Sequence, residues 1–115
     1  MCDGKLLDYL TNLYWRGDSD LLAPLLQCAD SRKDVIEEIG TFYGDLLDRR
    51  TAAALRGMRE VSIDKQKEIC SMAGEDDLSL NAPKLRRVTS RLHAAQDDVA
   101  ERCLQEAVRG AGHTP

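Results

Sequence analysis

The chain has 115 residues, a length that fits one domain with a modest hydrophobic core. Hydrophobic residues make up 43% of it and charged residues 31%, a balance that predicts a folded rather than a disordered protein. The formal net charge of -4 disfavours general nucleic-acid coats and proteins that bind membrane surfaces, because both classes are basic overall.

We expect a first helix from about residue 4 to residue 15. Its apolar residues recur at helical spacing and form a face that is wider than a short helix normally needs for packing. Tyrosine and tryptophan are frequent at binding hot spots, because one edge of each ring tolerates water. We therefore predict a partner-binding face, with Trp15 partly exposed. The residues assigned to this face are Leu6, Leu10, Leu13, Tyr14 and Trp15.

The middle of the chain continues the helical pattern. Asp18 to Asp20 offer capping oxygens for a second segment through Ala29. A third segment starts at the capping pattern of residues 31–34, and over residues 32–61 its apolar stripe fits either one helix or two helices that break near Thr51. Two glycines in this stripe, Gly40 and Gly44, predict close approach of a neighbouring helix.

The last part of the chain predicts a short helix over about 63–73 and then a long one. Asn81 is a cap and Pro83 fits the first turn of a helix over about 82–109, whose apolar spacing near 3.6 favours a straight helix in a bundle. The whole pattern predicts an all-α antiparallel bundle of four to six helices. We expect a single domain over 1–109 and a flexible C-terminal tail over 110–115.

Four cations, Lys84, Arg86, Arg87 and Arg91, occupy the first turns of this last predicted helix. The helix dipole and their mutual repulsion both disfavour this arrangement. Either the acidic run over residues 75–77 folds back and neutralises them, or they bind an external anion such as a phosphate backbone or an acidic partner. The basic patch is therefore a predicted site for an anion or an acidic partner.

The four cysteines, Cys2, Cys28, Cys70 and Cys103, show neither metal-binding nor redox spacing. Three of them lie in or beside apolar stripes, so we expect buried, unpaired thiols in a cytoplasmic protein. No apolar run approaches the roughly 20 residues that span a bilayer, so no membrane partner is expected.

The sequence carries no phosphate-binding loop and no nucleophile motif. His93, Asp97 and Glu101 form a row that could ligate a metal, but a solvated helix face explains them better. We expect no enzyme, no catalytic residue, no metal site and no cofactor. The favoured hypothesis is a non-enzymatic interaction module (an adaptor, chaperone or regulatory subunit) that binds a partner protein or a second copy of itself. The alternative is a nucleic-acid-binding regulator that uses the basic patch.

Overall fold

The computed structural model describes residue 2 and residues 4–29 and 37–112 of the chain. These residues form seven α-helices and two short 3-10 helices, with no strand among them. The predicted all-α class is confirmed, although the helices number more than the four to six expected. The molecule measures 36 × 26 × 25 Å along its principal axes.

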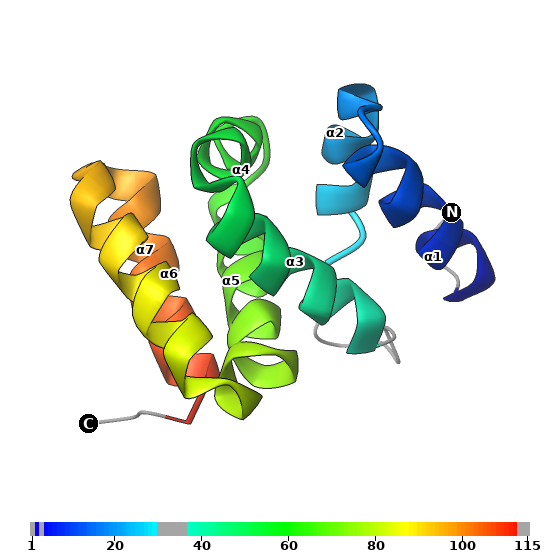
Figure 1. Ribbon diagram of the computed structural model, residues 1–115. Helices are drawn as coiled ribbons and strands as arrows, with labels where there is room; N and C mark the ends of the chain where they lie inside the picture. Colours follow the sequence, from blue (N-terminus) through cyan, green and yellow to red (C-terminus); the bar gives the residue numbers. More distant parts are fainter. Residues whose placement is uncertain (1, 3, 30–36, 113–115) are drawn as a thin grey trace.

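The helices are arranged in layers around α5, which crosses the middle of the molecule (Figure 1). Helices α6 and α7 lie on one side of α5, α3 packs on the other, and α1 and α2 form the far edge beyond α3. The first half of the chain contains α1 (Gly4–Trp15), a 3-10 turn (Ser19–Leu21), α2 (Leu22–Leu26), α3 (Glu37–Arg49) and α4 (Thr51–Met58). The second half contains α5 (Ile63–Asp76), a 3-10 turn (Leu78–Leu80), α6 (Ala82–Ala95) and α7 (Asp98–Gly110).

The prediction of one long helix over 82–109 is wrong, because the chain turns back on itself at Gln96. Gln96 adopts the left-handed conformation with φ of 53°, and it ends α6. Asp97 then caps α7, because its side chain accepts a hydrogen bond of 2.7 Å from the backbone N–H of Ala100. Helices α6 and α7 therefore run in opposite directions, whereas α5 and α7 run in the same direction (Figure 1). The break also puts His93 and Glu101 on different helices, so the predicted row does not exist.

The region over 32–61 divides in the same way. Arg50, with φ of -139° and ψ of 54°, leaves the helical conformation and separates α3 from α4. The two-helix alternative is thus the one observed within residues 37–58. The predicted cap over residues 31–34 lies outside the described residues.

Helices α5 and α7 approach each other at backbone contact distance. A Cβ atom built on Gly74 of α5 would overlap the carbonyl oxygen of Ala107 and lie 2.9 Å from the backbone nitrogen of Ala111. Gly110 lies in the same way against the carbonyl oxygen of Ser71, so this residue, which we expected to open the tail, closes α7 instead. Only small residues permit this packing. Residues 113–115 of the predicted tail lie outside the described residues.

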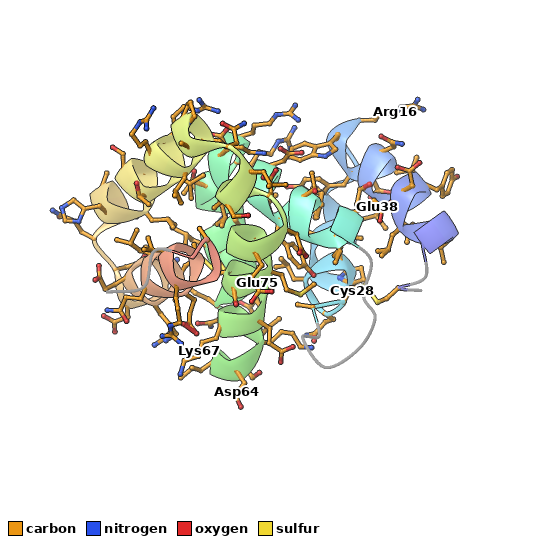
Figure 2. All side chains as sticks on the ribbon, turned by 90° about the horizontal axis from the view of Figure 1, so that it is seen from below. Arg16, Cys28, Glu38, Asp64, Lys67 and Glu75 are labelled. Carbon is orange, nitrogen blue, oxygen red and sulfur yellow. A yellow bond between two sulfur atoms is a disulfide. The ribbon has the colours of Figure 1, made fainter. Side chains whose placement is uncertain are left out.

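The prediction of unpaired thiols is wrong. Cys70 of α5 and Cys103 of α7 form a disulfide across the same interface, with their Cα atoms 5.3 Å apart. Cys2 and Cys28 form a second disulfide that joins the start of the chain to the residues after α2, and Figure 2 labels Cys28. Sequence spacing does not reveal either pair, because the partners are 33 and 26 residues apart and only the fold brings them together.

Two buried polar side chains fix the positions of the layers. The Tyr43 hydroxyl of α3 donates a 2.7 Å hydrogen bond to the carbonyl of Leu25 in α2. The Gln66 amide of α5 donates a 2.7 Å hydrogen bond to the carbonyl of Met58 and accepts one of 2.6 Å from Arg102 of α7. Because each bond joins different helices, these side chains link α2 to α3 and α4 to both α5 and α7.

The predicted close approach at Gly40 and Gly44 is confirmed. A Cβ atom on Gly40 would meet the side chain of Asp76, and one on Gly44 would meet the side chain of Asp77. The glycines thus allow the acidic end of α5 to lie directly on α3. This contact places carboxylates beside the start of α6.

Candidate interaction surfaces

Helix α1 contributes one side of its broad apolar face to the core. Leu7 and Tyr14 are each 1% exposed, and Tyr14 packs edge-on against Phe42 of α3 with ring centroids 5.6 Å apart. Tyr14, which we assigned to partner binding, is therefore a core residue and cannot contact a partner in this fold. The sequence pattern could not separate it from its neighbours, because the predicted face is wider than the part that α3 covers.

The other side of the α1 face is turned outward. Leu6 is 39% exposed and Tyr9, one helical turn further on, is 60% exposed, while Leu13 is half-buried and Leu10 is half-buried against the core. These four residues follow the spacing i, i+3, i+4, i+7 that defines one helical stripe. We call Leu6, Tyr9, Leu10 and Leu13 the α1 stripe. Tyr9 was missed in the sequence analysis, although its spacing from Leu6 and Leu13 was the available signal.

Trp15 is half-buried at the end of α1, as its amphipathic ring predicts. The guanidinium of Arg49 lies over the ring, 4.2 Å from its centroid, and Phe42 contacts it edge-on. Trp15 also lines a hollow of about 380 Å³ between α1 and α3, with Glu38 on the α3 side (Figure 2). Its position is therefore fixed by α3, and the part that remains exposed faces this hollow rather than the α1 stripe.

Lys84 of the basic patch is buried between α3 and the end of α5. Its ammonium forms an ion pair with Asp45 and another, of 2.5 Å, with Asp77. Burial alone would lower the pKa of Lys84, but the hydrogen bonds to Asp45 and Asp77 outweigh it and the pKa lies above its usual value. Burial also raises the pKa of Asp77, against the opposing effect of Lys84. Lys84 is thus a structural cation that no external anion can reach.

Arg87 and Arg91 share one carboxylate on α3. The guanidinium of Arg87 donates two hydrogen bonds, of 3.1 and 3.0 Å, to the two oxygens of Asp48, and Arg91 pairs with the same group. The hydrogen bonds from Arg87 hold the pKa of Asp48 below its usual value, and the charge of Arg91 adds to this effect. Bidentate arginine–carboxylate contacts of this kind are geometrically specific.

The basic patch is therefore neutralised from within the chain, but mainly by α3 rather than by the predicted run over 75–77. Of that run, Asp77 pairs with Lys84, and the other two carboxylates come from Asp45 and Asp48. Arg86 is exposed, and its guanidinium has no partner among the described residues. Three of the four cations are thus already paired within the chain, and these ion pairs disfavour the nucleic-acid alternative.

The described part of the chain holds no group of three or more His, Cys, Asp and Glu side chains placed to bind a metal ion. Among the helices of the described ranges, none has the length and apolar character needed to cross a membrane. Comparison of the chain with protein families, with curated proteins and with solved structures finds no match.

Proposed function

We propose that the chain is a non-enzymatic protein-interaction module that docks through the α1 stripe. The observation that carries the proposal is the exposure of Tyr9 (60%) next to that of Leu6 (39%) on one side of α1. A large aromatic ring with this exposure gains much more from burial against a partner than a small or charged side chain would. Adaptors, chaperones and regulatory subunits all act through such contacts.

The position of α1 supports docking of a helix. Helix α1 forms one edge of the molecule, so a partner can approach it without displacing another element (Figure 1). The spacing of the α1 stripe matches the one by which an amphipathic helix lies against another helix. The partner is either a different protein or a second copy of the chain.

The two disulfides bear on where such a module works. Disulfides persist in oxidising compartments and are rare in the cytosol. Their presence at both ends of the fold weighs against the cytoplasmic location that the cysteine spacing favoured. We therefore propose that the chain acts in an oxidising compartment.

Site-specific photo-crosslinking tests the docking proposal. A photo-reactive phenylalanine analogue replaces Tyr9 in one variant and Leu80 in a control variant, expressed in the same cells. Leu80 is a suitable control because it is 85% exposed but lies on the 3-10 turn after α5. We expect discrete crosslinked species from position 9 and none from position 80, and sedimentation velocity distinguishes a dimer from a complex with another protein. Equal yields from the two positions, or no crosslink from position 9, would contradict the proposal.

A further inference from the structure

A second surface is a groove of about 550 Å³ between α4 and the C-terminal half of α6. Its floor is formed by Leu55, which is buried, and by three exposed alanines, Ala52, Ala94 and Ala95. Alanine side chains cover little of the groove, so a larger apolar side chain from outside fits between the two helices. Grooves of this volume with apolar floors are typical of binding sites. We call this feature the α4/α6 groove.

The rim of the α4/α6 groove is positively charged. Arg56 is exposed, and no acceptor for its guanidinium is found in the part of the chain that the structure describes. Arg59 pairs with Asp97 across the groove, and the Arg59 side chain remains 49% exposed. Arg91 must share Asp48 with a second arginine, so one carboxylate faces two cations there.

This charge contrasts with that of the whole chain, which carries a formal net charge of -4. The rim arginines outnumber the lining carboxylate, Asp97, by three to one. Each guanidinium has five N–H donors, so Arg59 and Arg91 can bind a further carboxylate without losing their present partners. The groove therefore attracts acidic groups and repels basic ones.

We propose that the α4/α6 groove binds an acidic amphipathic helical segment of a partner protein. An apolar side chain of the segment packs on the floor between Leu55 and Ala94. Carboxylates on its flanks form bidentate ion pairs with Arg56 and with the exposed faces of Arg59 and Arg91. This proposal is independent of the α1 stripe, because the two surfaces share no residue.

Fluorescence anisotropy with two synthetic peptides tests the proposal. Both peptides have about 15 residues, enough for measurable helicity, with leucines along one face. One carries glutamates beside the leucines and the other carries lysines. We expect the intact chain to bind only the glutamate peptide.

Two variants locate the binding. Arg56→Glu reverses the unpaired charge and is expected to weaken binding at least about tenfold, and Ala94→Trp fills the groove and is expected to weaken it similarly. Both positions are exposed, so circular dichroism should show an unchanged fold. Arg86→Glu is the matched control, because it makes the same charge change at an exposed, unpaired arginine outside the groove. Its affinity should stay within about twofold.

Three results would overturn the proposal. Absence of binding, or equal binding of the lysine peptide, would remove the charge complementarity on which it depends. An equal loss in Arg56→Glu and Arg86→Glu would show attraction by overall charge rather than by the groove. Self-association of the chain that Arg56→Glu abolishes would instead assign the groove to a second copy.

Discussion

Two helix interfaces of this molecule are packed in opposite ways. At the α5/α7 interface, glycines and alanines bring two backbones into direct contact, and the Cys70–Cys103 disulfide crosses the same surface. At the α1/α3 interface, the aromatic rings of Tyr14, Trp15 and Phe42 meet edge-on with centroids 5.3 to 5.7 Å apart.

The difference in packing agrees with the proposal that the α5/α7 interface serves stability and the outer side of α1 serves binding. Where small residues bring two backbones into contact, no side chain of the interface is left exposed to a partner, and a larger residue has no space. Large rings leave part of their surface outside the contact, as the half-buried Trp15 shows, and Tyr9 of the same helix is 60% exposed. We therefore expect changes at α5/α7 to affect stability and changes along the α1 stripe to affect binding.

The largest effect is expected from removing the Cys70–Cys103 disulfide. Its 33-residue separation predicts a loss of about 4 kcal/mol for the Cys70→Ala, Cys103→Ala variant, since the cross-link restricts the unfolded chain and both sulfurs are buried. Urea unfolding measures the loss. The Cys2→Ala, Cys28→Ala variant is the comparison and should lose less, about 3.5 kcal/mol, because the separation of 26 residues closes a shorter loop and only Cys28 of the pair is buried. If the two variants lost equal amounts of stability, or if the order were reversed, the result would contradict the contrast between the two interfaces.

Gly74→Ala should be the next most damaging change. The new Cβ overlaps the backbone carbonyl of Ala107, which cannot move without shifting α7, so we expect a loss of about 3 kcal/mol. Gly57→Ala is the matched control, because the atoms nearest to its Cβ belong to the side chains of Leu26 and Leu22 rather than to a backbone, and alanine favours the helix by about 1 kcal/mol. Similar losses in both variants would show that backbone contact is not what limits α5 and α7.

Asp48→Asn tests the contact between α3 and α6. We expect a loss of about 1 kcal/mol at neutral pH, because Arg87 and Arg91 lose their shared charge. Since the folded pKa of Asp48 lies below its unfolded value of about 3.9, the carboxylate stabilises the fold above that pH. Its contribution is lost as the pH falls through the folded pKa. Unfolding measured from pH 7 down to pH 2 should therefore show the two proteins converging below about pH 4. If the difference in stability between the two proteins stayed constant across this pH range, the loss in Asp48→Asn would not come from the charge of Asp48.

Gln96→Gly is expected to have the smallest effect and the opposite sign. Gln96 has positive φ, which glycine adopts without strain, so we expect a gain of about 0.5 kcal/mol in the free energy of unfolding. If α6 and α7 were one continuous helix, the same change would cost about 1 kcal/mol. The sign in thermal or urea unfolding thus decides whether the chain breaks at this point.

The sequence predicted those features that depend on neighbours along the chain. Helical spacing predicted the all-α class and most helix positions, and Asn81 caps α6 as expected. It failed at Gln96, because the apolar stripe passes through the break and the capping signal of Asp97 was read as part of a polar row. That signal was available, since α7 begins with acidic residues that favour a helix start.

The candidate surfaces were only partly predictable, because they depend on which residues meet in space. The unusual width of the α1 face was visible, but only the position of α3 decides that Tyr14 is covered and Tyr9 is not. The cations on α6 were visible as an anomaly, whereas their partners on α3 lie about 40 residues away along the chain, as the separation of 39 between Arg87 and Asp48 shows. The α4/α6 groove has no local signature, since it exists only where two helices leave a space.

The Cys2–Cys28 bond closes α1, the following turn and α2 into a covalent loop. Residues 16–20, which connect these helices, are all exposed, and exposed connecting segments are preferred sites of proteolysis. A single cleavage there opens the loop but releases no fragment, because the Cys2–Cys28 disulfide still joins the N-terminal fragment to the rest of the chain. Helix α1 would therefore stay attached after such cleavage until a reductant breaks the disulfide.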